Sequence, residues 1–356
     1  MNITSKITSW KFIVNTLFVV ALVVAIIHIL AFSLFDLSSS MFNSVNFSGF
    51  AADGPFQIYN PLRRLAAGQI IGRDFQFFHG IGIPLFNYPL FHLLGSNVFA
   101  SEFTRWILSY LTFISTAFIF FKVTLRSYRN TIIATSLALL ITLPLADVIF
   151  PSNSLVGIRS TVPIIFASVY LLNIKRTFLV KYIKIELRLL VLGILAALSI
   201  IMGTEQGFAL IAGYCISELL IFRKDLMAAT IRIGSFLLIL FTSLLLLFTV
   251  ITHGHPLIPL KYMIDASRDQ SWYFGVDPQD FLSWHRIITQ LTVPFMMYVY
   301  ELLGLAVALL IINRKFRLID FQKQRVYVLL VIYGLFCLCY AGYWRVLLPR
   351  SKFDFS

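Results

Sequence analysis

The chain has 356 residues, of which 59% are hydrophobic and 13% charged, and 35 of them are Phe. A surface facing water cannot accommodate this composition, so it excludes an ordinary soluble domain and indicates that lipid is the solvent for much of the chain. The net charge of +13 is explained by basic loops that meet anionic headgroups, and it gives no support to nucleic-acid binding.

Apolar runs long enough to cross about 30 Å of hydrocarbon recur along the chain. We predict spans at residues 12–35, 103–121, 131–150, 161–174, 189–202, 208–222, 233–251, 287–312 and 327–347. The expected fold is an all-α polytopic membrane protein of about nine transmembrane helices, organised as a single transmembrane domain over residues 1–356. The first span, 12–35, is too long for the apolar core of a signal peptide, so we expect it to be retained.

The distribution of basic residues predicts the orientation of these spans. With a cytoplasmic N-terminus, 18 of the 29 Lys and Arg residues fall on the cytoplasmic side, which is the direction of the positive-inside rule. Most carboxylates then fall on the outer side. We therefore expect a multi-pass integral membrane protein with its polar, acidic surface outside the cytoplasm.

The first outer loop, residues 36–98, is too long to be a simple connector. Within residues 56–69 the apolar and arginine side chains fall on different faces, which is typical of a short helix lying in the membrane interface. Pro61 predicts that this helix begins near that position. Residues 84–95 are predicted to form a second interfacial helix, ended by Gly95.

Three further polar segments are predicted on the outer side. Residues 151–159 follow the third span, and residues 203–207 form a tight, glycine-bounded turn between the fifth and sixth. Residues 253–286 form the second large outer loop, in which aromatic side chains beside carboxylates suit either a sugar-binding surface or an interfacial belt. The pair His253 and His255 fits no standard zinc spacing, so no metal site is predicted there. The three cysteines lie in apolar segments and are expected to pack rather than form disulfides.

The order of these motifs resembles that of the GT-C membrane glycosyltransferases, the superfamily of protein O-mannosyltransferases and the aminoarabinose transferase of lipid A. The resemblance rests on Asp53 and six short segments. They are Asp53 at the head of an interfacial helix with Leu65-Ala66-Ala67-Gly68, Gly72-Arg73-Asp74-Phe75 and Gly80-Ile81-Gly82-Ile83-Pro84 after it, Pro151 to Arg159, Gly203 to Gly207, and Leu348 to Asp354. It extends over most of the chain, although each motif is short.

The resemblance implies transfer of a sugar from a polyprenyl-phosphate carrier to an acceptor hydroxyl on the extracytoplasmic face of the cell envelope, with a lipid, glycan or protein as acceptor. Independently of the family, such chemistry needs a base for the hydroxyl and cations for the departing phosphate at the membrane surface. Asp53 is the candidate base of an inverting reaction. The alternative is that Asp53 only caps the helix that follows it.

The commonest family pattern places a second acidic residue beside the first or two positions away, where this chain has Gly54 and Pro55. A metal held by an acidic pair is therefore not favoured, and we expect no cofactor. Asp74 is the candidate for a second catalytic carboxylate. The alternative is a turn residue paired with Arg73 or Arg64.

Substrate-binding residues are expected among the outer cations and at Glu205. Arg159 and Arg350 lie in segments that resemble the family, while Arg268 and Lys352 are further candidates for the phosphate. Each could instead anchor the chain at the lipid headgroups. Glu205 is expected to face a polar cavity, because a carboxylate near the membrane interior is costly unless it does.

Two other classes of function compete with the transferase. A secondary transporter or lipid flippase predicts half-chain repeats and ionisable groups at the bilayer midplane, and neither is evident here. A non-catalytic membrane partner with the same fold is not separated from an enzyme by the sequence.

Overall fold

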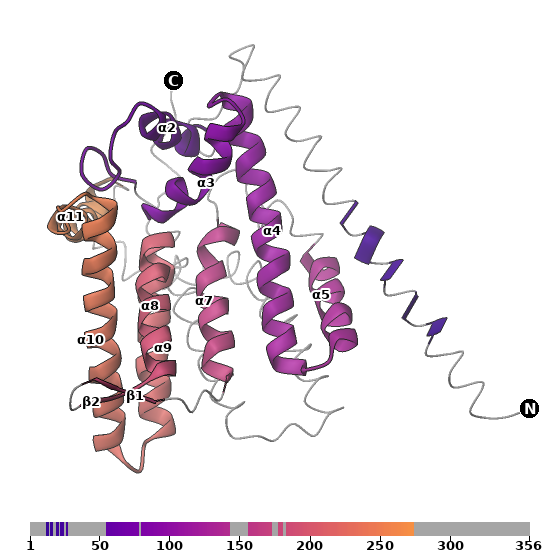
Figure 1. Cartoon of the computed structure of the whole chain (residues 1–356), viewed down its shortest axis with the longest axis vertical. Coiled ribbons are helices and arrows are strands. Elements are labelled where there is room, and N and C mark those ends of the chain that lie inside the picture. The colour runs from indigo at the N-terminus through magenta and orange to yellow at the C-terminus, as the bar shows by residue number, and fades with distance from the viewer. Residues whose placement is uncertain are drawn as a thin grey trace, which may run out of the picture. The chain divides into compact units, whose positions relative to one another are not determined.

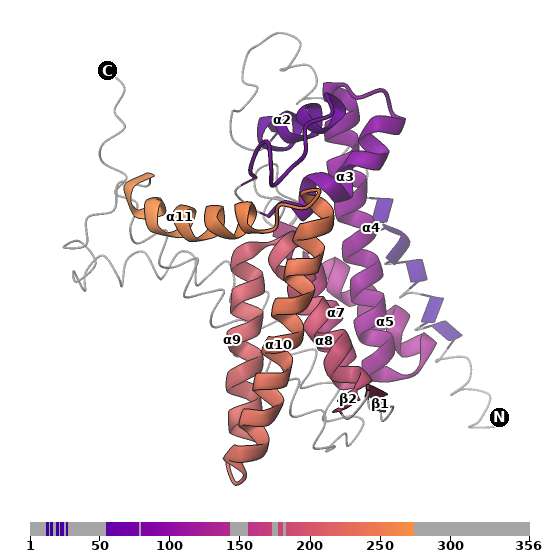
Figure 2. The same cartoon turned by 60° about the vertical axis from the view of Figure 1, so that its left-hand side comes forward.

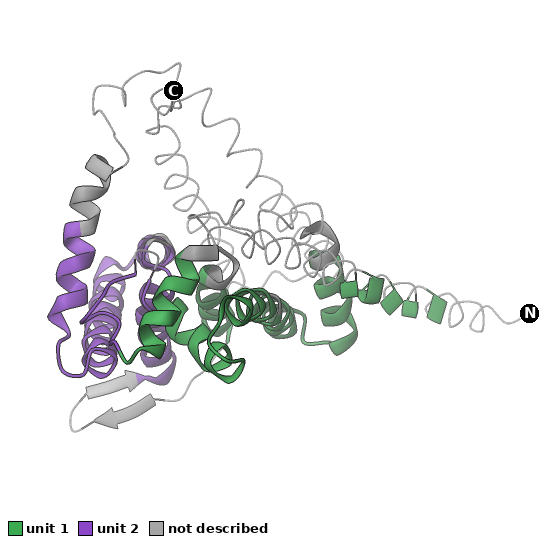
Figure 3. Cartoon of the chain, turned by 90° about the horizontal axis from the view of Figure 1, so that it is seen from above, with its two compact units in different colours: residues 1–68, 83–172 green, residues 69–82, 173–356 purple. Residues whose placement is uncertain are grey.

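The computed structural model of the chain describes parts of residues 12–27 and residues 55–77, 80–142, 156–172, 177–180 and 183–273 (Figure 1). Over these residues the structure is mostly helical, as predicted. It divides into two compact units, residues 1–68 with 83–172 (unit 1) and residues 69–82 with 173–356 (unit 2), shown in Figure 3. Each unit is described here by itself.

Unit 1 is built around α4 (Val98–Leu125), which packs against α2 (Pro55–Ala66), α5 (Tyr128–Thr142) and α7 (Val156–Leu171). The sequence sets both ends of α4. The side chain of Asn97 accepts a hydrogen bond from the Ala100 N–H at 2.8 Å and caps the start. Arg126 adopts a left-handed conformation, and its N–H bonds to the Lys122 carbonyl and ends the helix.

The two predicted interfacial helices are present as α2 and α3 (Gly82–Leu93). The prediction that the first begins near Pro61 is wrong, because α2 begins at Pro55 and contains Pro61. Pro55 occupies the first helical position, where its missing N–H has no partner to lose. The end of α3 is confirmed, since the N–H groups of Gly95 and Ser96 bond to the His92 and Phe91 carbonyls in a Schellman motif.

Unit 2 contains three long helices, α8 (Leu187–Met202), α9 (Thr204–Ile221) and α10 (Leu226–Ile251) (Figures 1 and 2). Helices α8 and α10 run antiparallel to α9. Helices α8 and α10 approach each other closely at Gly193 of α8, where an added Cβ would lie 2.5 Å from the Ile239 side chain of α10. Because of this order, the α8–α9 junction and the C-terminal end of α10 lie at one end of the unit. The starts of α8 and α10 lie at the other.

Two of the described helices, α4 and α10, are long and apolar enough to cross a membrane. On α10, Phe236, Leu240, Leu244 and Phe248 recur every four residues and are buried. The other face exposes large apolar side chains, with Leu238 70% exposed and Val250 75% exposed. An apolar surface of this kind on a 26-residue helix fits contact with lipid.

The predicted spans between 103 and 251 fall on helices α4, α5, α7, α8, α9 and α10. The spans at 287–312 and 327–347 lie outside the described residues, and the topology of about nine spans stays a prediction. A short antiparallel hairpin, β1 (Thr177–Val180) and β2 (Ile183–Glu186), departs from the all-α prediction. In β2 apolar and polar residues alternate, and β1 is mostly apolar. Each strand has only four residues, which is too short for a membrane span.

Three predicted loops contain helix in the structure. Residues 156–159 open α7, so Arg159 is helical. In the segment 203–207 only Gly203 is outside a helix, and Thr204 already begins α9. The second large outer loop contains α11 (Leu257–Tyr273), which follows α10 after a short turn (Figure 2). The first two segments contribute the first turn of a helix, where boundaries are hardest to predict, and the third contains a helix of 17 residues.

Candidate functional site

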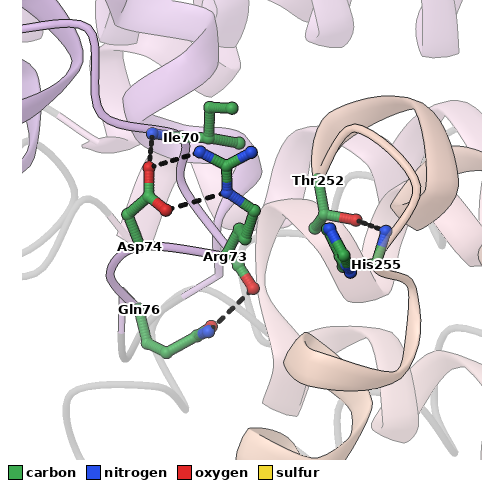
Figure 4. A network of polar contacts seen from close by, with 7 residues as sticks. Ile70, Arg73, Asp74, Gln76, Thr252 and His255 are labelled. Carbon is green, nitrogen blue, oxygen red and sulfur yellow. Dashed lines mark hydrogen bonds and ion pairs between the residues drawn. The ribbon is translucent and has the colours of Figure 1, made fainter.

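Asp74 closes a compact turn in unit 2 (Figure 4). Its carboxylate accepts hydrogen bonds from the Ile70 N–H at 2.8 Å and from the Arg73 guanidinium at 2.8 and 3.1 Å. In return, the Asp74 N–H donates to the Ile70 carbonyl at 2.8 Å. This is the geometry of the alternative considered for Asp74, a turn residue paired with Arg73. A catalytic role for Asp74 stays a prediction.

The Arg73–Asp74 pair lies at the surface, with about a third of each side chain exposed. The hydrogen bond to Asp74 raises the pKa of the Arg73 guanidinium above its ordinary value, so the guanidinium stays charged. On the other side of the same turn, the Gln76 amide donates to the Gly72 carbonyl at 2.9 Å. The turn is therefore held by several bonds and not by the ion pair alone.

The segment 69–82 is fixed to one end of the unit 2 helices by close backbone contacts. An added Cβ on Gly80 would lie 2.6 Å from the Ile201 carbonyl oxygen, and one on Gly82 would lie 2.8 Å from the Ile201 side chain. An added Cβ on Gly72 would lie 3.0 Å from Thr252 and 3.9 Å from Pro259. The motif 72–75 and the glycines of the motif 80–82 therefore adjoin the α8–α9 junction and the turn after α10.

That turn carries His253 and His255. His253 and Gly254 both have positive φ angles, of 52° and 97°, and the Thr252 hydroxyl accepts a hydrogen bond from the His255 N–H at 3.0 Å (Figure 4). The hydroxyl thus caps the chain as it reverses toward α11. Among the residues that the structure describes, no three His, Cys, Asp or Glu side chains lie together as a metal site would require.

Glu205 and Arg268 belong to helices of unit 2. Glu205 is the second residue of α9, and Arg268 lies in the second half of α11. The positions of both side chains lie outside the described part of the structure.

Gly207 explains why α8 and α9 lie so close at their junction, because an added Cβ at Gly207 would lie 2.6 Å from the Ile200 backbone. The junction, the segment 69–82 and the turn after α10 form the polar end of unit 2.

In unit 1, Arg159 lies in the first turn of α7 and is only 6% exposed. Helix α7 packs against α4. Asp53, the candidate base, lies outside the described residues, as do Arg350 and Lys352, but α2 begins two residues after Asp53 and contacts α4. Ile58 and Leu62 fix α2 in place and are fully buried.

Sequence reasoning missed a buried ion pair in α4. The carboxylate of Glu102 accepts a hydrogen bond from the Arg105 guanidinium at 2.5 Å, and the two residues are 1% and 3% exposed. The guanidinium also lies 5.4 Å from the centre of the Trp106 ring. The i, i+3 spacing of Glu102 and Arg105 was visible in the sequence, but the same spacing is common on exposed helices.

No family model, no curated protein and no solved structure significantly matches this chain.

Proposed function

We propose that this chain is a membrane glycosyltransferase that moves a sugar from a polyprenyl-phosphate donor to an acceptor hydroxyl on the extracytoplasmic side. The observation that carries the proposal is the placement of α2. This helix begins two residues after Asp53, buries Ile58 and Leu62, and packs against α4, which is long enough to cross a membrane. The proposal places the Asp53 carboxylate close to this candidate span, where the headgroup of a lipid donor would lie.

In the proposed reaction, Asp53 accepts the proton of the acceptor hydroxyl as its oxygen attacks the anomeric carbon of the sugar. The new C–O bond forms while the bond from that carbon to the phosphate oxygen breaks. Configuration at the carbon inverts, and the polyprenyl phosphate leaves with the bonding electron pair. Negative charge grows on the phosphate in this step, so a nearby guanidinium lowers the barrier.

Arg159, Arg268, Arg350 and Lys352 are the cations proposed for this phosphate, and Glu205 is proposed to bind a substrate hydroxyl. Arg159 is the candidate from unit 1. It is buried in the first turn of α7, a helix that packs on α4. A guanidinium matches two phosphate oxygens with two parallel donors, which favours arginine for this role. Asp74 is proposed to order the segment 69–82, and its use as a second catalytic carboxylate is the alternative.

The proposal is tested by supplying purified full-length protein with polyprenyl phosphates that carry radiolabelled glucose, mannose or aminoarabinose, together with membrane lipid, glycan and peptide acceptors. Transfer of label from at least one donor is expected, and it should persist after exhaustive chelation of divalent metals. A protein that binds none of these lipids and transfers no label would contradict the proposal. Strict dependence on added magnesium or manganese would contradict its metal-independent form.

A further inference from the structure

Helix α11 exposes large apolar side chains on one face. Leu257 is 70% exposed, Ile264 69% and Ile258 39%. Residues four and seven positions apart lie on the same face of a helix, so Leu257, the exposed Lys261 and Ile264 form one stripe, with Ile258 at its edge. We call these four residues the α11 face. Neighbouring exposed apolar side chains of this kind mark a contact surface, unlike those scattered singly.

The opposite side of α11 is covered by unit 2 itself. Pro259 is buried, and an added Cβ on Gly72 would lie 3.9 Å from the Pro259 Cβ atom. At 3.6 residues per turn, Pro259 lies about 140° to 160° round the helix from Leu257, Lys261 and Ile264. The α11 face therefore points away from the segment 69–82.

The position of α11 relative to α10 indicates what this face meets. Helix α10 has 26 residues and is about 39 Å long, which is enough to cross the hydrocarbon of a membrane and reach the headgroups. Its exposed apolar surface continues to Val250, and only residues 252–256 separate it from α11. Figure 2 shows α11 running across the end of α10 instead of extending its axis. The α11 face thus begins where the surface of α10 that fits lipid contact ends.

Lys261 separates a lipid surface from a protein partner as the occupant of this face. It lies between Leu257 and Ile264 in the stripe and is exposed. A partner protein that covered the stripe with apolar side chains would bury the Lys261 ammonium, which is costly without a counter-charge. At a lipid surface the apolar stem of the lysine lies along acyl chains while its ammonium reaches phosphate oxygens. The stripe therefore matches the boundary between acyl chains and headgroups.

We infer that α11 is an interfacial helix, which lies flat on the lipid surface with Leu257, Ile258 and Ile264 among the upper acyl-chain carbons and Lys261 at the phosphates. Because Gly72 lies against Thr252 and Pro259, an anchored α11 also holds the segment 69–82 at a fixed height above the membrane. Lipid contact of the α11 face does not depend on whether the chain transfers sugar, so the two proposals fail separately.

The test measures the membrane depth of single fluorophore-labelled cysteines in full-length, otherwise cysteine-free protein in phospholipid nanodiscs. Quenching by lipids with a nitroxide near the headgroup or near the chain end gives the depth, and quenching by iodide gives exposure to water. Leu257→Cys and Ile264→Cys should be quenched best by the nitroxide near the headgroup and should lie at equal depth. A helix that crossed the membrane would separate these two positions by about 10 Å.

Two kinds of control position calibrate the measurement. Leu238→Cys and Leu246→Cys lie eight residues apart on the exposed side of α10, and their depths should differ by about 12 Å. Lys224→Cys, in the exposed turn between α9 and α10, should be quenched by iodide and not by lipid. Equal depths for the two α10 positions would show that α10 does not cross the membrane and would overturn the inference with its premise.

A paired set of variants tests whether the apolar side chains cause the lipid contact, with the label on Ile258→Cys. Leu257→Asp combined with Ile264→Asp should lose most of the lipid quenching and gain iodide quenching, because two charges replace the apolar stripe. Leu257→Met combined with Ile264→Met keeps the stripe apolar and should keep the lipid quenching.

Four results would overturn the inference. They are iodide quenching of Leu257→Cys and Ile264→Cys as strong as that of Lys224→Cys, protection of both positions from lipid and iodide alike, a depth difference of about 10 Å between them, and lipid quenching that survives the paired aspartates. The second result would show that protein covers the α11 face.

Discussion

Gly80 is the residue that most restricts how the segment 69–82 can lie in unit 2. Its φ of +122° is in the region that side chains avoid, and an added Cβ would lie 2.6 Å from the Ile201 carbonyl oxygen and 2.9 Å from the Met202 carbonyl carbon. Both contacts are to backbone, so no side chain can move away to relieve them. The motif Gly80-Ile81-Gly82, identified in the sequence by its resemblance to a family, therefore has a physical basis in this chain.

We predict that Gly80→Ala destabilises the protein by about 2 to 3 kcal/mol, from the unfavourable backbone conformation together with the backbone clash. Thermal unfolding in detergent measures the effect. Gly234→Ala is the matched control, because Gly234 is helical and has nothing within 4 Å of an added Cβ, so the variant should be as stable as wild type or slightly more. Equal stability of the two variants would contradict this account of Gly80.

Asp74→Asn distinguishes the two interpretations of Asp74. Asparagine keeps an oxygen that can accept from the Ile70 N–H but loses the ion pair with Arg73, which is a third exposed and therefore contributes little to stability. If Asp74 orders the turn, transfer should stay within a few-fold of wild type, whereas Asp74→Ala should lower it further. Complete loss of transfer in a folded Asp74→Asn protein would make Asp74 a catalytic residue.

Helices α9 and α10 of unit 2 and the β-hairpin are joined by charges at the end opposite the segment 69–82. The Arg232 guanidinium of α10 bonds to Glu218 of α9 at 2.7 Å and to Glu186, the last residue of β2, at 3.4 Å. Glu218 is fully buried, and the ring of Tyr214 lies 4.2 Å from that of Phe236. The hairpin and two helices are thereby connected through one arginine.

Removing Arg232 should therefore cost more than removing an exposed arginine. We expect Arg232→Ala to lower the free energy of unfolding by about 3 kcal/mol, because it removes the 2.7 Å ion pair of the fully buried Glu218 carboxylate. Arg223→Ala, in the turn between α9 and α10, is the exposed control and should change stability by less than about 0.5 kcal/mol. Similar unfolding curves for the two variants would show that the Arg232 contacts do not stabilise unit 2.

Hydropathy located the interiors of the helices well, because both lipid and the packed interior require apolar side chains there. It located their ends poorly. Pro61 predicted a helix start, although α2 begins at Pro55. Arg159 was placed in a polar segment between spans and Glu205 in a turn, although each lies in the first turn of a helix. These ends depend on caps and close backbone contacts that hydropathy does not measure.

The candidate site was predictable only in part for a similar reason. The sequence predicted that several polar segments share one side of the membrane, and the segments 69–82, 203–207 and 252–259 adjoin in unit 2. It did not show that Glu102 and Arg105 are buried, because burial depends on neighbours that are distant in the chain. Nor could it show that Asp74 bonds to the Ile70 N–H, which depends on the path of the turn.

The orientation of the whole molecule is a prediction from the Lys and Arg count. In a cysteine-free background, Ser44→Cys should react with an impermeant thiol reagent only from outside the cytoplasmic membrane. Lys224→Cys, in the turn between α9 and α10, should react only from the cytoplasmic side. Labelling of both positions from one side, or labelling of Ser44→Cys from the cytoplasm alone, would show that the proposed orientation is wrong.

The most direct test of the central claim is transfer of labelled sugar from a polyprenyl-phosphate donor by the Asp53→Asn variant, compared with wild type. A base acts in the transition state, so the variant should lose turnover by at least about 100-fold while donor affinity and thermal stability stay near the wild-type values. If Asp53 only caps α2, asparagine should replace it with little loss, because both residues cap helices well. Turnover within a few-fold of wild type would therefore contradict the assignment of Asp53 as the catalytic base.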